Sequence, residues 1–158
     1  MKRQCHSAVA FFLSVALVLG GCAAPSPWVK TPSNAKIYTM MEIPMRNLVE
    51  HPEKYIGTVF EDRFKFYHIY HSREDVEPGS RQQVILGKTH FTARPIKQDT
   101  MMIQIQITPH QESWMQAHHV VRQDVLRARV RFAGIAPGEA LAFELLEITQ
   151  PPIHMRQK

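Results

Sequence analysis

The sequence contains very little cysteine, and this shortage excludes several kinds of site. Its 158 residues include only two cysteines, Cys5 and Cys22, both within the first 22 positions. The chain beyond position 22 therefore has no thiol for a disulfide, for a cysteine-ligated zinc ion or for nucleophilic catalysis. We expect this part of the chain to be held together by packing alone.

Recognisable catalytic motifs are missing too. The sequence has no HExxH zinc motif, no serine at a glycine-flanked nucleophile elbow and no phosphate-binding glycine loop. The carboxylates of Glu74, Asp75 and Glu77 cluster beside Pro78 and Gly79, a pattern more typical of a solvated loop than of an acid–base pair. We therefore expect a protein that is not an enzyme and that needs no cofactor.

A strong charge of either sign is also absent. The formal net charge is +5, from 19 Lys and Arg against 14 Asp and Glu. Without Lys2 and Arg3 the count is 17 against 14, which leaves +3. Such a small excess identifies no particular partner, and we expect no nucleic acid to be bound.

The sequence does contain one apolar run, close to its N-terminus. Lys2 and Arg3 precede an uncharged stretch over residues 8–19, and Gly20-Gly21-Cys22 follows. A basic head, a short apolar stretch and small residues make up a secretory signal, and this run is shorter than the roughly 20 residues that span a bilayer. We predict a signal peptide over residues 1–21.

The segment Leu19-Gly20-Gly21-Cys22 resembles the lipobox of bacterial lipoproteins. The resemblance implies cleavage before Cys22, a diacylglyceryl group on the Cys22 thiol and acylation of the new amino group. Because Ala23 rather than Asp follows the cysteine, it also implies sorting to the outer membrane. An ordinary secreted protein that is cut elsewhere is the alternative.

Cleavage before Cys22 leaves 158 − 21 = 137 residues, the size of one compact domain. Residues 22–35 contain three prolines among serines and an asparagine, which predicts a semi-rigid tether. Trp28 in this tether lies either at the membrane interface or on the domain. We predict the domain over residues 36–150 and a C-terminal tail over residues 151–158.

Hydrophobic periodicity predicts a mainly β domain. Residues 58–71, 82–93, 101–108 and 125–135, and a last segment that begins near residue 141, carry strand patterns. Residues 45–51 predict a short helix whose apolar face holds Met45, Leu48 and Val49 and which Pro52 ends. A second helix should begin at Thr108, with Pro109 in the first turn and Gln111 as the capping-box partner.

The same patterns predict which side chains face the core. In the second helix we expect an inward stripe of Trp114, Ala117, His118 and Val121. In the strands the expected core residues are Phe60, Phe64, Phe66, Tyr70, Met101, Ile103, Ile105, Ile107, Leu126, Ala128, Val130, Phe132, Leu141, Phe143 and Leu145. The strand over residues 82–93 carries Val84, Ile85, Leu86 and Phe91.

Five strands with a helix between the third and the fourth are the order of an OB-fold, a small five-stranded barrel. In addition, Leu48-x-x-x-Pro52-x-x-Tyr55-x-Gly57 is similar to the entry of the first strand in small OB-like (Slp-type) bacterial envelope lipoproteins. The resemblance covers that entry and the element order, although residues 61–66 lack the glycines such proteins often carry. We predict an OB-like barrel with a short N-terminal helix.

The nine histidines are poorly spaced for a metal site. His68 and His71 point to opposite faces of a strand, and the adjacent His118 and His119 diverge on a helix. We expect no bound metal.

Two outward patterns remain as candidate binding residues. Arg127, Arg129 and Arg131 recur at every second position and so line one face of a strand, where Glu144 should stand opposite Arg129 or Arg131. The row is either an ordinary cross-strand ion-pair face or a contact site. Residues 63–70 interleave basic and aromatic side chains, and Tyr67 is their one clear outward ring.

Three functions are compatible with these patterns. The first is a non-catalytic lipoprotein, anchored in the membrane through Cys22, whose domain docks on an envelope protein through the arginine row. The second is a binding module for an anionic glycan or a small envelope ligand, which uses the same arginines with Tyr67. The third is a hydrolase, for which no catalytic residues are visible.

Replacing Cys22 with serine should abolish lipidation, because serine offers no thiol for the thioether and Cys5 lies within the signal head. Labelling cells with a fatty-acid analogue measures this directly. Cys5→Ser is the matched control and should keep the label. Equal label on wild type and Cys22→Ser would contradict the lipoprotein interpretation.

Overall fold

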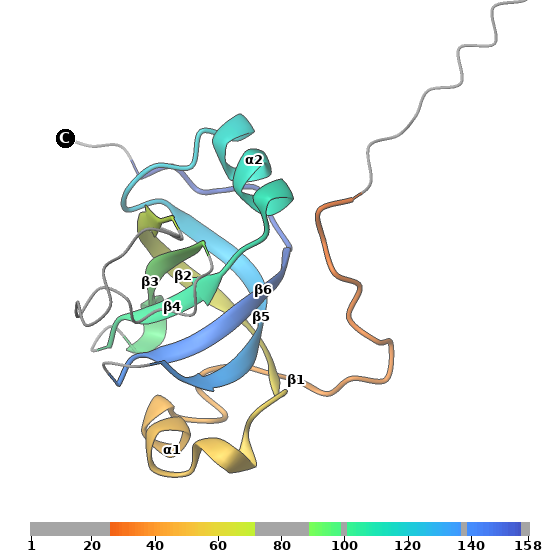
Figure 1. The fold of residues 1–158 in the computed structure, drawn as a ribbon, viewed down its shortest axis with the longest axis vertical. Coiled ribbons are helices and arrows are strands. Elements are labelled where there is room, and N and C mark those ends of the chain that lie inside the picture. Colours follow the sequence, from red (N-terminus) through yellow and green to blue (C-terminus); the bar gives the residue numbers. More distant parts are fainter. Residues whose placement is uncertain (1–25, 72–88, 99–100, 137–138, 156–158) are drawn as a thin grey trace, which may run out of the picture.

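The structure is a computed structural model that describes residues 26–71, 89–98, 101–136 and 139–155 (Figure 1). The predicted signal peptide, Cys22 and the carboxylates of residues 74–77 lie outside the described residues. The described elements are β1 (Ile37–Tyr38), α1 (Met45–Glu50), the 3-10 helix η1 (Pro52–Lys54), β2 (Val59–Tyr70), β3 (His90–Pro95), the 3-10 helix η2 (Ile96–Gln98), β4 (Ile103–Gln106), α2 (Pro109–Ala117), β5 (Val125–Ile135) and β6 (Leu141–Ile148).

The strands form one sheet that closes into a barrel. Their order is β1-β2-β3-β4-β6-β5, and β5 pairs back onto β2. The β4–β6 pair is parallel, whereas β2–β3, β3–β4, β5–β6 and β2–β5 are antiparallel. With α2 between β4 and β5, this is the connectivity of an OB-like barrel, so the predicted fold class is confirmed. The short β1 is an addition that the sequence analysis did not predict.

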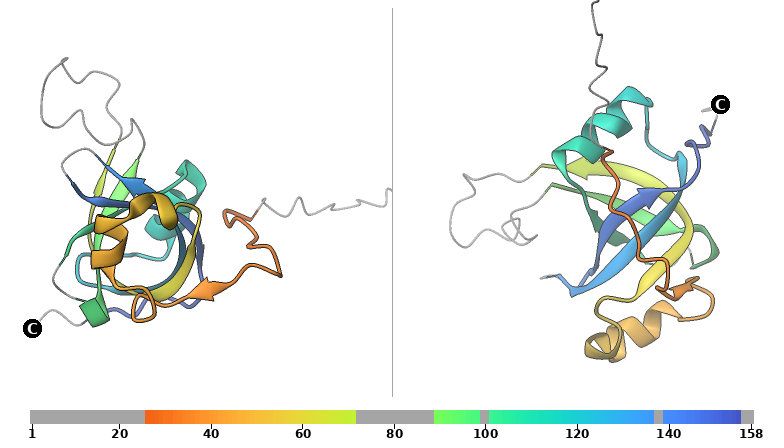
Figure 2. Two further views of the ribbon diagram at one scale, coloured as in Figure 1. Left: turned by 90° about the horizontal axis from the view of Figure 1, so that it is seen from below. Right: turned by 90° about the vertical axis from the view of Figure 1, so that its right-hand side faces the viewer.

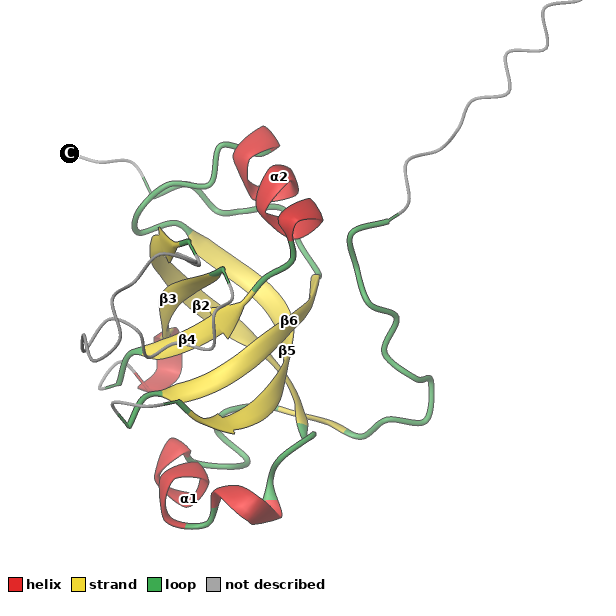
Figure 3. Cartoon of the chain, in the orientation of Figure 1, coloured by secondary structure: helices red, strands yellow, loops and turns green. Residues whose placement is uncertain are grey.

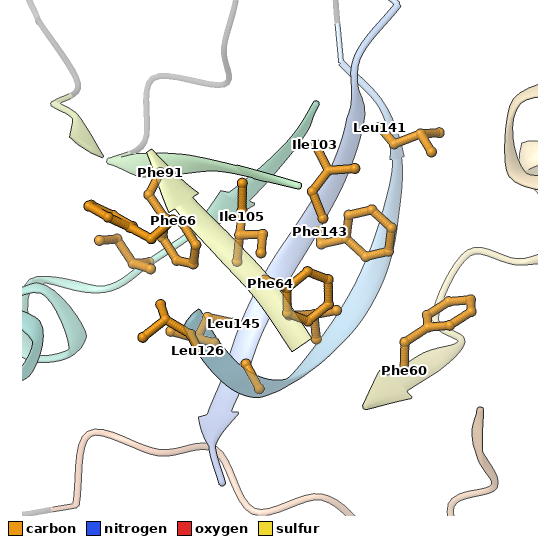
Figure 4. Close-up of a cluster of buried hydrophobic side chains, with 14 of the residues drawn as sticks. Phe60, Phe64, Phe66, Phe91, Ile103, Ile105, Leu126, Leu141, Phe143 and Leu145 are labelled. Carbon is orange, nitrogen blue, oxygen red and sulfur yellow. The ribbon is translucent and has the colours of Figure 1, made fainter. Parts of the chain in front are cut away.

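The inside of the barrel is filled by aromatic and aliphatic side chains from all five barrel strands (Figure 4). Phe60 packs edge-to-face on Phe143, with ring centroids 6.0 Å apart, and Phe132 contacts the same ring at 5.3 Å. The predicted inward residues of β5 and β6 are confirmed, because Leu126, Ala128, Val130, Phe132, Leu141, Phe143 and Leu145 are all buried. Period-two patterning thus predicted these faces correctly.

The predicted inward position of Tyr70 is wrong, because a register shift interrupts β2. The pairing of β2 with β3 shifts between Phe66 and His68. Beyond that irregularity the alternation is displaced by one residue, so Ile69 pairs with the buried Phe91 and Tyr70 is 49% exposed. The predicted second strand is described only from His90 onwards, and its residues 82–88 lie outside the described part.

Helix α2 covers one end of the barrel (Figure 3), with a different face from the one predicted. The capping box is confirmed, since Gln111 N–H donates to Thr108 Oγ1 at 3.2 Å and Thr108 N–H donates to Gln111 Oε1 at 2.9 Å. The buried residues are Gln111 and Met115, whereas Ala117 and His118 are exposed. The Gln111 amide donates to Leu145 O at 3.0 Å, and this polar anchor rotates the helix away from the predicted stripe.

Helix α1 covers the opposite end (Figure 3). Met45 and Leu48 are buried as predicted, but Val49 is 39% exposed, because the short helix presents only one narrow face to the barrel. The buried carboxylate of Asp62 accepts the Met40 N–H at 3.1 Å, and Gln98 accepts the Met45 N–H at 3.2 Å. These bonds fix the entry to α1 against the barrel.

The backbone conformation just before β2 explains why Gly57 ends the Leu48-x-x-x-Pro52-x-x-Tyr55-x-Gly57 motif. Gly57 has φ +86°, a conformation that side chains with a Cβ rarely adopt. Its N–H donates to Phe132 O at 2.9 Å, which extends the β2–β5 pairing by one bond. Among the helices of the described part of the chain, none is long and apolar enough to cross a bilayer.

Ile105→Asp should unfold the domain, because Ile105 is fully buried and a carboxylate there has no partner. A typical domain is stable by only about 5–15 kcal/mol. The free-energy cost of burying an unpaired charge is large enough to remove most or all of that stability. Ile105→Val is the matched control and should cost only about 0.5–1.5 kcal/mol. A circular-dichroism melt of Ile105→Asp that overlays wild type would refute the position of β4.

Candidate functional site

The predicted arginine row lies on the outer face of β5, between β2 and β6. Arg127, Arg129 and Arg131 alternate with buried residues, and their side chains are 42%, 31% and 46% exposed. Glu61 from β2 and Glu144 and Glu147 from β6 flank them. We call these six residues the charged face: Glu61, Arg127, Arg129, Arg131, Glu144 and Glu147.

Arg129 is the centre of the charged face. Its Nε donates to Glu61 Oε2 at 2.8 Å, and its Nη1 donates to Glu147 Oε2 at 3.1 Å. The second oxygen of Glu61 lies 3.0 Å from the Nε of Arg127. One carboxylate therefore bridges two arginines, and one arginine bridges the two neighbouring strands.

Arg131 makes the third cross-strand pair. Its Cα partner on β6 is Glu144, one of the two positions that the sequence predicted for that residue. The Nε of Arg131 donates to Glu144 Oε2 at 2.9 Å. The predicted ion pair is confirmed, and each arginine of the row has a carboxylate of the same chain within bonding distance.

Sequence reasoning missed Glu61 and Glu147 as partners of the row. Period two places Glu61 on the outer face of β2, but the register that puts it opposite Arg129 comes from the long-range β2–β5 pairing. It also missed Arg63, which stands directly opposite Arg127. Arg63 is exposed, and within the described part of the chain it makes no ion pair.

Tyr67 belongs to a different part of the surface. The β2–β5 pairing ends at Lys65, whereas Tyr67 lies on the part of β2 that pairs with β3. The guanidinium of Arg94 lies over its ring, 5.5 Å from the centroid. Tyr67 is four residues beyond the Arg63 that faces Arg127, or about 13 Å along the strand. The structure does not bring Tyr67 and the arginine row together.

Several of the described histidines contact an aromatic ring or a single carboxylate. His71 Nε2 lies 2.6 Å from Glu112 Oε1, and His154 Nδ1 lies 2.9 Å from Asp124 Oδ2. His118 stacks on Trp114 with centroids 3.7 Å apart. Over residues 26–71, 89–98, 101–136 and 139–155, no group of three or more His, Cys, Asp or Glu is placed to hold a metal ion.

Two side chains near α1 have shifted pKa values. The Thr39 backbone N–H, 2.6 Å from Glu42 Oε2, and the Thr39 hydroxyl hold the pKa of Glu42 below its usual value. The side chain of Glu50 raises the pKa of Arg46 by accepting its hydrogen bond. The Thr39–Glu42 pair precedes α1, and the Arg46–Glu50 pair lies within it.

Comparison with known proteins gives no match to a family model, to a curated protein or to a solved structure. The chemistry of the charged face is therefore argued from its geometry.

That geometry holds guanidinium groups in fixed positions without using all their donors. A guanidinium has five N–H donors, and Arg129 uses one each for Glu61 and Glu147. The remaining donors of the row can bind a carboxylate or a phosphate from outside, often in a bidentate manner. The three carboxylates of the charged face balance its three arginines, so its formal net charge is zero.

Arg129→Gln should lower the free energy of unfolding by about 1 kcal/mol, because it removes two partly buried ion pairs and leaves Glu61 and Glu147 with one partner fewer. Arg63→Gln, the matched control on the same face, should change stability by less than about 0.5 kcal/mol. Urea unfolding of both variants measures the difference. Equal losses would mean that the ion pairs of Arg129 do not contribute.

Proposed function

We propose that the protein is a non-catalytic lipoprotein of the bacterial outer membrane, anchored through Cys22, whose barrel docks on an envelope partner protein through the charged face. The proposal combines the lipobox resemblance with the arrangement of the arginine row. It places the barrel in the periplasm.

The observation that carries the docking proposal is the fixed position of three arginines on a regular strand. Side-chain ordering costs about 0.5–1.5 kcal/mol for each long side chain that binding immobilises. In this barrel Glu61, Glu144 and Glu147 already order the row. A partner with acidic groups at strand spacing can therefore bind without that cost. Arg63 beside Arg127 adds a charge that no described carboxylate neutralises.

The alternative is a binding module for an anionic glycan or a small envelope ligand. It requires Tyr67 and the arginines to contact one ligand. Tyr67 lies about 13 Å along the strand direction from the position opposite Arg127, which favours a ligand of several sugar units over a single one. The charged face by itself is extended along the strands, which favours a protein partner.

Replacing Arg127, Arg129 and Arg131 together with Gln should abolish co-purification of the partner after mild detergent extraction, because it removes every guanidinium of the row. The matched control replaces Lys36, Lys54 and Lys97 with Gln, which removes the same charge from exposed positions elsewhere. We expect one protein to co-purify in stoichiometric amount with wild type and with the control.

Retention of the partner by a folded Arg127/Arg129/Arg131 variant would contradict the docking face. Carbohydrate that co-purifies with wild type in place of a protein would favour the glycan alternative. A thermal melt of each variant shows that loss of the partner is not loss of the fold.

A further inference from the structure

The N-terminal tether lies on the barrel at both ends of its described part. Trp28 is half-buried, and its ring packs edge-to-face on Trp114 of α2, with centroids 5.0 Å apart. The Val29 N–H donates to Leu146 O of β6 at 2.9 Å. Further along, Ile37 pairs with Val59 at the start of β2. Of the two positions open to Trp28 from the sequence, the structure places it on the domain.

The direction of the tether follows from these contacts. Trp28 lies at the α2 end of the barrel, and β1 lies towards the α1 end, so the tether runs along the side formed by β5 and β6 (Figure 2, right). Ser26, the first described residue, accepts the Trp28 N–H through its hydroxyl oxygen at 3.4 Å and so lies at the α2 end too. The two helices mark opposite ends of the barrel (Figure 1).

Very little chain separates this end from the lipidation site. Cys22 precedes Ser26 by 26 − 22 = 4 residues, which span at most about 14 Å. Ile37 at the other end of the tether is 37 − 22 = 15 residues away and could reach about 50 Å from Cys22 if the tether were released. Docking of Trp28 thus shortens the free part of the tether and fixes which end of the barrel is near the acyl chains.

Polar side chains of α2 and of the loop after it are exposed at this end of the barrel. His110, His118, His119 and Arg122 are all exposed there. Among the described carboxylates of α2 and the loop that follows it, Glu112 is bound by His71 and Asp124 is fully buried. Arg122 is the one fixed cation of this set, and cations favour anionic headgroups. The α1 end carries Arg46 and Lys54 together with Glu50 and Glu53.

We infer that the α2 end of the barrel faces the membrane surface and that the Trp28–Trp114 contact holds it there, so that the α1 end projects away from the lipid. This inference rests on the proposed lipidation of Cys22. The charged face, on β5 between β2 and β6, then lies on the side of the barrel and at neither end.

Spin labels at the two ends test the orientation. Residues after Cys22 include no other cysteine, so Ser113→Cys on α2 or Glu53→Cys beside α1 provides one labelling site once Cys22 is acylated. The lipidated protein is reconstituted in vesicles of phosphatidylethanolamine and phosphatidylglycerol with a nickel-chelating lipid. Collision of the nitroxide with nickel, measured by power saturation, should be several-fold greater at position 113 than at position 53.

Substitutions of Trp28 test whether its contact with Trp114 causes this orientation. Trp28→Ala should bring the collision ratio of the two positions close to one, whereas Trp28→Phe, which keeps an aromatic ring on Trp114, should preserve the difference. Equal collision at both positions in the wild-type background, or an unchanged ratio in a folded Trp28→Ala variant, would overturn the inference. Flotation of the vesicles is measured first: protein that does not float refutes the lipoprotein proposal, whereas protein that floats with equal collision refutes only the orientation.

Discussion

Strand β2 pairs with β5 along residues 59–65 and with β3 along residues 64–70, and this double pairing closes the barrel. Its inward side chains, Phe60, Phe64 and Phe66, reach the core, and Asp62 between them binds the segment that leads into α1. Its outward side chains place Glu61 against Arg129 and Arg63 opposite Arg127. The charged face therefore exists only when β2 and β5 are in this register, because a shift of one residue turns each outward side chain inward.

Local patterns in the sequence were sufficient for much of the fold. The alternation in β5 and the capping box of α2 depend on neighbours a few residues apart, and both were predicted correctly. Two of the failures have non-local causes. The register shift between Phe66 and His68 exposes Tyr70, and the bond from Gln111 to Leu145 turns α2 so that Met115 is buried in place of His118. Both the β2–β3 pairing and the Gln111–Leu145 bond join residues that are far apart in the sequence.

The candidate site shows the same division. Period two placed Arg127, Arg129 and Arg131 on one face, and the hairpin between β5 and β6 placed Glu144 near the row. Glu61 comes from 129 − 61 = 68 residues away, and Trp114 meets Trp28 across 86 residues, so neither pairing follows from spacing alone. The proposed membrane orientation and the proposed docking face both depend on these long-range contacts. In that proposed arrangement the lipid anchor and α2 fix the distance of the barrel from the membrane surface. The charged face then points parallel to the membrane, towards the envelope partner protein.

Site-specific photo-crosslinking in living cells tests the docking face most directly. A photoreactive amino acid in place of Arg63 lies beside Arg127 and leaves the three arginines of the row intact. The same residue in place of Ser113 on α2 is the control. The account predicts that position 63 crosslinks to one envelope protein, that position 113 does not, and that the Arg127/Arg129/Arg131→Gln background removes the crosslink. A crosslink from position 63 that persists in that background, or none at all from a folded and lipidated protein, would contradict it.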